Sequence, residues 1–157
     1  MNSLHVRYTI LFVLAFILQF TVVQFMEILH WRPDLLLIVV VIFALRKGPN
    51  WGMTLGFITG FLQDLLSTHL IGLLALSKTL AGFIAGMLRG KFAEKTEFFL
   101  TLLIAGLFHD IIYFFIQTIG EDFSLRSLII LYTLPNLMYT IIIGGILYYF
   151  IEPLLSE

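Results

Sequence analysis

Four ionisable residues, Asp64, Lys78, His109 and Asp110, occur within long apolar stretches of the sequence. A charged group at the centre of a bilayer costs about 2.5–3.5 kcal/mol on insertion scales, so such residues pair with one another or serve a function. Lys78 lies near the middle of its apolar stretch, where its side chain reaches the head groups with difficulty. We therefore predict a buried pair between Lys78 and the carboxylate of Asp64 or Asp110. Such a pair could serve a function or could only fix the register of the helices.

The dipeptide His109–Asp110 is of a type used in acid–base chemistry and proton relays. Neighbouring residues on a helix point about 100° apart, so we do not expect both side chains to face one substrate. A histidine that is hydrogen-bonded to a nearby polar group such as Asn136 is the more ordinary arrangement. One hypothesis for the function is therefore an intramembrane enzyme that uses His109 and Asp110; two others are described below.

No other spacing in the chain indicates catalysis or metal binding. The sequence contains neither H-x-x-x-H nor H-E-x-x-H, the usual helical arrangements of zinc-binding histidines. It has no cysteine, which excludes disulfides, thiolate ligands and cysteine nucleophiles. We therefore predict a protein that is not an enzyme and that has no catalytic residues, no metal site and no cofactor.

The composition places these residues in an integral membrane protein. Of the 157 residues, 60% are hydrophobic and only 12% are charged, whereas about a quarter are charged in soluble domains. The formal net charge of −1 gives no electrostatic reason to expect nucleic acid as a partner. The N-terminal apolar run is too long for a signal peptide and no cleavage site follows it, so we interpret it as a retained span. Partners are therefore expected within the lipid bilayer.

The apolar segments predict an all-α fold with about six transmembrane helices in one compact bundle, a single transmembrane domain over residues 1–157. About 20 apolar residues are needed to cross the hydrocarbon core, and the second and third segments are shorter, so they could form a thin or re-entrant hairpin joined at RKGPN. We expect Pro135 to kink the last helix by removing a backbone hydrogen bond. The predicted helices lie near residues 8–28, 34–46, 51–66, 70–88, 98–118 and 128–150.

The distribution of lysine and arginine predicts the orientation, since cytoplasmic loops carry more of them. With six spans and a cytoplasmic N-terminus, six of these residues lie inside and only Arg32 and Arg126 lie outside. Five spans with an external N-terminus give the same tally, because Arg7 and Arg32 exchange sides. Both arrangements place the RKGPN turn and the RGKFAEK loop in the cytoplasm and residues 121–122 outside. We prefer six spans, with both termini in the cytoplasm.

Seven of the twelve glycines form two ladders with a glycine at every fourth position. Residues four apart share a helix face, and a stripe of glycines lets a second helix approach closely. The stripe could form a groove for the transmembrane helix of a partner, or it could pack the bundle internally, which we favour. The ladders are Gly48, Gly52, Gly56 and Gly60, and Gly82, Gly86 and Gly90.

Residues 32–76, RPDLLLIVVVIFALRKGPNWGMTLGFITGFLQDLLSTHLIGLLAL, resemble the family of the rod shape-determining protein MreD. The family pattern has a Pro-Asp-Leu helix start, a basic-Gly-Pro turn, a G-x-x-x-G-F-x-x-G-x-x-x-D run, and then Gly and Leu. Beyond Gly90 the similarity is in hydropathy only, so Lys78, His109 and Asp110 inherit no role from it. The matching positions are Pro33, Asp34, Leu35, Arg46, Gly48, Pro49, Gly52, Gly56, Phe57, Gly60, Asp64, Gly72 and Leu76.

The resemblance implies a non-enzymatic scaffold or regulatory subunit in the bacterial inner (cytoplasmic) membrane. Such a subunit binds the membrane-anchored scaffold MreC and, through it, acts with MreB, RodA and the partner transpeptidase of RodA in lateral peptidoglycan synthesis. The resemblance also implies a fold like that of the S component, the substrate-binding subunit of energy-coupling-factor vitamin transporters.

The alternative function is that of such a vitamin-binding S component, with Asp64, Thr68 and His69 in a capped pocket near the outer side. S components usually carry small residues spaced by four on their first helix, where the transporter partner docks. Here Ala15 stands alone among bulky residues, which counts against this alternative.

Overall fold

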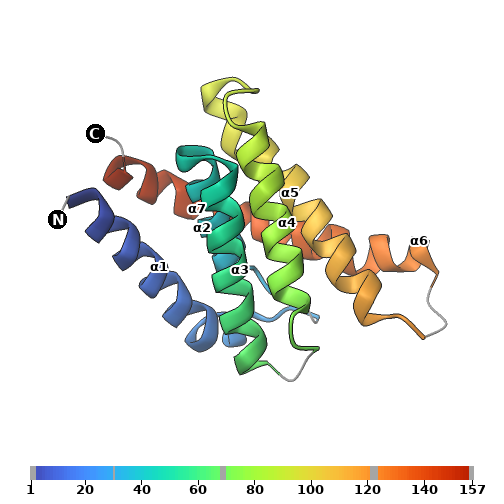
Figure 1. Ribbon diagram of the computed structural model, residues 1–157. Helices are drawn as coiled ribbons and strands as arrows, with labels where there is room; N and C mark the ends of the chain where they lie inside the picture. Colours follow the sequence, from blue (N-terminus) through green and yellow to red (C-terminus); the bar gives the residue numbers. More distant parts are fainter. Residues whose placement is uncertain (1–2, 30, 68–69, 121–123, 156–157) are drawn as a thin grey trace.

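The computed structural model describes residues 3–29, 31–67, 70–120 and 124–155 (Figure 1). These residues are almost entirely helical, and α6, η2 and α7 continue one another, so the described chain forms six helices. The predicted all-α class is confirmed. The elements are α1 (Ser3–Thr21), η1 (Val23–Met26), α2 (Leu35–Lys47), α3 (Pro49–Leu66), α4 (Leu73–Leu88), α5 (Glu94–Gln117), α6 (Leu125–Leu128), η2 (Ile129–Thr133) and α7 (Leu134–Leu155).

Two of the described helices are long and apolar enough to cross a membrane. They are α5, with 24 residues, and the continuous helix Leu125–Pro153, with 29 residues. Val6–Thr21 and Leu73–Leu88 are apolar but shorter. The exposed surface of all these helices is rich in large hydrophobic side chains, as expected where lipid replaces water as the solvent.

The helix α2 forms the centre of the molecule. All side chains of residues 35–42 are buried, and α2 contacts α1, α3, α4, α5 and α7. The unbroken apolar run LLLIVVVI leaves α2 with no polar face, so it can pack against other helices on every side. The remaining helices are therefore arranged around α2.

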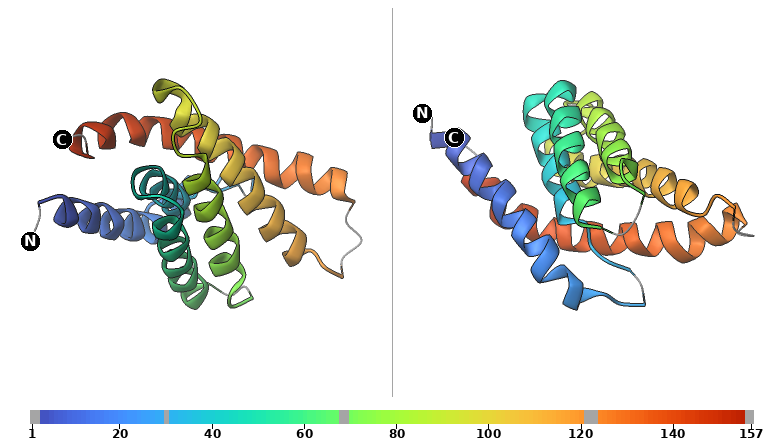
Figure 2. Two further views of the ribbon diagram at one scale, coloured as in Figure 1. Left: turned by 45° about the horizontal axis from the view of Figure 1, so that its top comes forward. Right: turned by 60° about the horizontal axis from the view of Figure 1, so that its bottom comes forward.

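The first helix packs against α2 at two places along its length. Ala15, Leu36 and Val39 form a small buried cluster, and the Tyr8 ring lies 4.5 Å from the Phe43 ring, measured between ring centres. Toward its N-terminus α1 diverges from α3 (Figure 1). The start of α1 and the end of α7 lie on the same side of the molecule (Figure 1 and Figure 2).

The two glycine ladders face each other across the contact between α3 and α4. A Cβ added at Gly52 or Gly82 would overlap the backbone of the other glycine, and one added at Gly56 would overlap the carbonyl of Lys78. A Cβ added at Gly60 would overlap the carbonyl oxygen of Leu74. Five of the seven ladder glycines thus pack the bundle internally, and their face cannot form an open groove for a partner. The other two, Gly48 and Gly90, have no such close approach.

The helix boundaries differ from the predicted ones at both ends of the chain. The first α-helix ends at Thr21 and a short 3-10 helix follows, so the first predicted span is too long. The last helix starts at Leu125 and contains a π-helical turn at Ile129–Thr133, which ends two residues before Pro135. Because a π turn relocates backbone hydrogen bonds, it accommodates the missing amide proton of Pro135 while the helix continues.

Candidate functional site

Lys78 pairs with Asp34, which the sequence analysis assigned only to the start of a helix. Asp34 does cap α2, since its Oδ1 accepts a 2.9 Å hydrogen bond from the Leu37 amide. Its second oxygen, Oδ2, accepts a hydrogen bond from Lys78 Nζ, and the two groups form a salt bridge. Lys78 is fully buried. The prediction that Lys78 pairs with Asp64 or Asp110 is therefore wrong. The reason is that α4 packs against α2 and brings Lys78 to the N-terminus of α2.

Asp64 caps the fourth helix. Its carboxylate accepts hydrogen bonds of 2.9, 3.1 and 3.0 Å from the backbone amides of Gly72, Leu74 and Ala75. These amides lie at the N-terminus of α4, where no intrahelical acceptor exists and a negative charge is favourable. Asp64 is 1% exposed, so it does not reach interfacial water as its position in the sequence suggested.

The capping role of Asp64 also removes it from the pocket that the vitamin-binding alternative would require. Its carboxylate accepts hydrogen bonds from backbone amides at the start of α4. The other two residues of that predicted pocket, Thr68 and His69, lie outside the described residues, as do residues 121–122 of the predicted external loop.

We predict that Asp64→Asn lowers the free energy of unfolding by about 2–3 kcal/mol. The asparagine amide has one acceptor oxygen where the carboxylate has two, so the substitution leaves buried backbone amide protons unpaired. Reversible unfolding by SDS in mixed micelles, followed by circular dichroism, measures the change. Glu152→Gln is the matched control, since Glu152 is exposed on α7 and its loss should change stability by less than about 0.5 kcal/mol. Equal stability of the two variants would show that the cap contributes nothing.

Two glycines of the family pattern lie in the turns before α3 and α4, and Phe57 of the same pattern lies on the surface. Gly48 has a φ of 95°, which only glycine adopts without strain, and it connects α2 to Pro49, the first residue of α3. Gly72 has the same φ and directly precedes α4. Phe57 points outward, is 54% exposed and stacks on Phe61.

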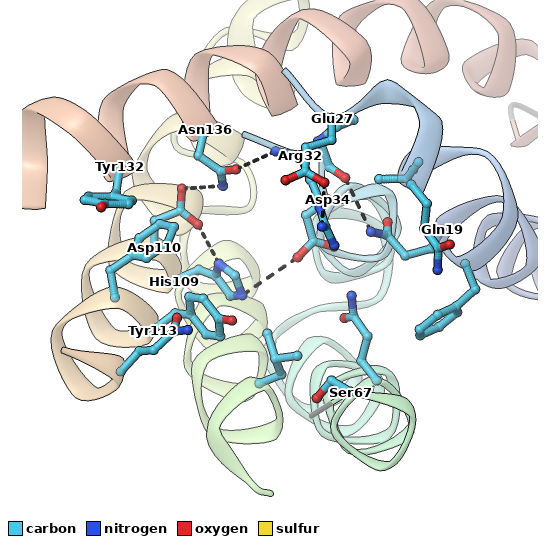
Figure 3. Close-up of a pocket in the computed structure, with 18 of the residues that line it drawn as sticks. Gln19, Glu27, Arg32, Asp34, Ser67, His109, Asp110, Tyr113, Tyr132 and Asn136 are labelled. Atoms are coloured by element: carbon cyan, nitrogen blue, oxygen red, sulfur yellow. Dashed lines mark hydrogen bonds and ion pairs between the residues drawn. The ribbon is translucent and has the colours of Figure 1, made fainter. Parts of the chain in front are cut away.

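The buried residues His109 and Asp110 form a second polar group next to the ion pair, together with the half-buried Asn136 (Figure 3). His109 Nδ1 lies 2.9 Å from Asp110 Oδ1, and Asn136 Nδ2 donates a 3.0 Å hydrogen bond to Asp110 Oδ2. The amide of Asn136 thus contacts Asp110, and not His109 as expected. The other imidazole nitrogen, His109 Nε2, lies 3.9 Å from Asp34 Oδ2, so the two groups face each other.

These groups line a polar cavity of about 620 Å³ at the end of the bundle where α2 begins and α3 ends. His109 and Asp110 both line it, and their side chains contact each other. The expectation that the two would not both face one substrate stays a prediction. Other polar side chains on its wall are Gln19, Gln24, Glu27, Arg32, Asp34, Gln63, Ser67, Tyr113, Gln117, Thr118, Tyr132 and Asn136.

The segment between α1 and α2 closes one side of the cavity. It is attached to the last helix by hydrogen bonds from Trp31 Nε1 to the Leu131 carbonyl and from Tyr139 to the Met26 carbonyl, both of 2.9 Å. Arg32 forms a 2.5 Å salt bridge with Glu27 at the rim. No pattern in the sequence predicts this arrangement, which depends on contacts between residues about a hundred positions apart.

A second, mainly apolar groove lies at the opposite end of the bundle, where α1 diverges. It has a volume of about 320 Å³. Lys47 at its edge lies over the Tyr8 ring, 5.4 Å from the ring centre. The groove is lined by Tyr8, Thr9 and Phe12 of α1, Phe43 and Lys47 of α2, and Trp51 and Leu55 of α3.

Comparison with known proteins assigns the chain to one family. The family model described as "rod shape-determining protein MreD" matches residues 3–157. The match therefore extends beyond residues 32–76, which carry the motif, to the helices that hold His109, Asp110 and Asn136. No curated protein and no solved structure matches the chain.

Proposed function

Because the chain belongs to the MreD family of rod shape-determining proteins, we propose that it is a non-enzymatic scaffold subunit of the machinery that elongates the lateral cell wall. The observation that carries the proposal is the family match, which covers residues 3–157. The family gives the chain a role in rod shape determination. The composition supports a subunit that acts within the membrane, where its partners must reach it.

The proposed direct partner is MreC, which would connect the chain to MreB, RodA and the partner transpeptidase of RodA. We place the transmembrane helix of MreC in the apolar groove between α1, α2 and α3. The groove has aromatic and aliphatic walls and a single lysine at its edge. Among the described residues no Cα atom of α1 lies within 8 Å of one in α3, which supports the groove between them as the docking place.

This placement replaces the glycine ladder as the interface. The ladder faces are buried against each other, whereas Trp51 beside them is 58% exposed. A partner helix in the groove would gain packing contacts with Phe12, Phe43 and Leu55, and such contacts drive helix association in lipid.

Two observations in the native host test the proposal. Cells depleted of the chain should lose their rod shape, and the tagged chain purified from native membranes should recover MreC. Depleted cells that keep their shape would contradict the cellular role, and a folded chain that recovers no MreC would contradict the partner.

We further propose that the chain crosses the inner membrane several times, with both termini in the cytoplasm. The start of α1 and the end of α7 lie on the same side of the molecule (Figure 2), which supports an even number of spans. Since the chain has no cysteine, single cysteines can report the topology. We predict that an impermeant maleimide labels Leu70→Cys in intact spheroplasts and labels Ala93→Cys only after permeabilisation. The reverse labelling pattern would indicate the opposite orientation. A reporter fused to the N-terminus distinguishes five spans from six, because the two arrangements place the N-terminus on different sides of the membrane.

A solute-binding subunit is the second candidate, and the polar cavity is the observation that favours it. An S component would bind a vitamin there with nanomolar affinity. Thermal-shift screening of the purified chain against vitamins tests this function, and a saturable nanomolar response would overturn the scaffold proposal.

A further inference from the structure

The apolar groove between α1, α2 and α3 opens at the positively charged end of the bundle (Figure 1). Six cations and three carboxylates lie among the described residues at this end, which gives a formal charge of +3. The cations are Arg7, Arg46, Lys47, Arg89, Lys91 and Lys95, and the carboxylates are Glu94, Glu97 and Glu152. A surface with this excess of positive charge attracts anionic partners.

Lys47 is the cation that lines the groove itself. Its side chain is exposed, and its Nζ lies over the Tyr8 ring at the groove mouth. Arg89 brings a second positive charge near it, because Arg89 Nη1 lies 3.9 Å from the position that a Cβ on Gly48 would occupy. Neither Lys47 nor Arg89 forms a salt bridge with another described residue. Both cations are therefore available to an anionic group from outside the chain.

The walls of the groove become fully apolar one helical turn below the mouth. Each of the three helices places a residue with a polar atom at the mouth and an apolar residue four positions deeper, on the same helix face. The pairs are Tyr8 and Phe12, Lys47 and Phe43, and Trp51 and Leu55. Trp51 is 58% exposed, and tryptophan is typical of the level of the lipid head groups. The groove thus fits an amphiphile with its polar group at the mouth and an apolar chain in the space of about 320 Å³ below.

We propose that, in the chain without MreC, this groove binds one anionic phospholipid. Its phosphate pairs with Lys47, and one of its acyl chains lies along Phe12, Phe43 and Leu55. A lysine near the membrane surface favours an anionic over a neutral lipid by about fivefold. The inference rests on the proposed function in one respect only, since the transmembrane helix of MreC would have to displace the acyl chain.

Tryptophan quenching by lipids with brominated acyl chains tests the proposal on the purified full chain, without MreC, in nanodiscs of phosphatidylcholine. The chain has two tryptophans, and the variant Trp51→Phe gives the contribution of the other one. We expect brominated phosphatidylglycerol to reach half of its quenching of Trp51 at an about fivefold lower mole fraction than brominated phosphatidylcholine. Identical quenching curves for the two lipids would overturn the proposal.

Lys47→Gln removes the charge at the groove mouth and keeps most of the side chain. We expect the quenching curves of the two lipids to coincide in this variant. Arg126→Gln is the matched control, because Arg126 is an exposed cation near the start of the last helix, at the other end of the bundle, and the fivefold preference should remain there. A preference that survives Lys47→Gln, or that Arg126→Gln abolishes equally, would exclude Lys47 as the phosphate-binding residue and overturn the proposal.

Native mass spectrometry of the chain released from phosphatidylglycerol nanodiscs tests the position of the acyl chain. We expect the wild type to retain one phosphatidylglycerol and Leu55→Trp, which fills the groove, to lose it. Leu65→Trp is the control, because Leu65 lies on α3 outside the groove and is 56% exposed, so this variant should retain the lipid. A wild type without bound lipid, or equal retention by the two variants, would contradict the site. Neither result bears on the recovery of MreC from native membranes, which tests the proposed function separately.

Discussion

Replacing Lys78 with methionine is expected to destabilise the fold by about 3–5 kcal/mol, the usual cost of removing one partner from a buried ion pair. Methionine has nearly the same length and fits the space, so the loss comes from charge and not from packing. Asp34 then keeps its cap on α2 but loses the cation beside Oδ2. SDS unfolding in mixed micelles measures the change.

The double variant Asp34→Asn/Lys78→Met separates the ion pair from other effects. Asparagine retains an oxygen that can accept from the Leu37 amide, so the cap survives while the charge is lost. We expect each single variant to be strongly destabilised and the double variant to lose much less than their sum, as for groups in direct contact. Lys95→Met, at the exposed start of α5, is the control. A Lys78→Met variant as stable as the wild type would contradict the buried pair.

Replacing Gly56 with alanine is expected to lower the free energy of unfolding by at least about 2–3 kcal/mol, although alanine is the better helix former. The added Cβ would overlap the backbone carbonyl of Lys78, and a backbone atom cannot turn aside as a side chain can. The contact between α3 and α4 would have to open, and Lys78 would move away from Asp34. The same unfolding experiment measures this effect.

Gly145→Ala provides the matched control for the glycine prediction. Gly145 is also helical, but an added Cβ there would meet only the ring of Phe99, at 2.9 Å. The ring can shift, so we expect a change within about 1 kcal/mol. If Gly56→Ala were as well tolerated as Gly145→Ala, the close approach of α3 and α4 would not matter for stability.

The sequence predicted the local features of this fold well, because each depends on nearby residues. The start of α2 at Pro33 and Asp34, the turn at Gly48 and the close packing of the ladders follow from backbone geometry and helix capping. The all-helical class follows from the composition and the lengths of the apolar segments. Helix ends were less accurate, since a π turn before Pro135 has no clear signature in the sequence.

The partners of the buried charges could not be predicted in the same way. Asp34 and Lys78 are 44 residues apart, and their contact depends on how α4 packs against α2. Asp64 was a reasonable candidate by its position, but its oxygens are used by three amides of α4. The polar cavity was missed because its wall combines three stretches that are far apart in the sequence, residues 19–34, 63–74 and 109–136.

Site-specific crosslinking in the native membrane tests the central claim most directly. A photoreactive benzoylphenylalanine at position 12 or 55 lies in the apolar groove, and one at position 108 or 142 lies on the exposed faces of α5 and α7. We predict that illumination links MreC to positions 12 and 55 and leaves positions 108 and 142 without an MreC adduct. MreC linked only at 108 or 142, or at none of the four positions while it still co-purifies, would contradict the proposed scaffold interface.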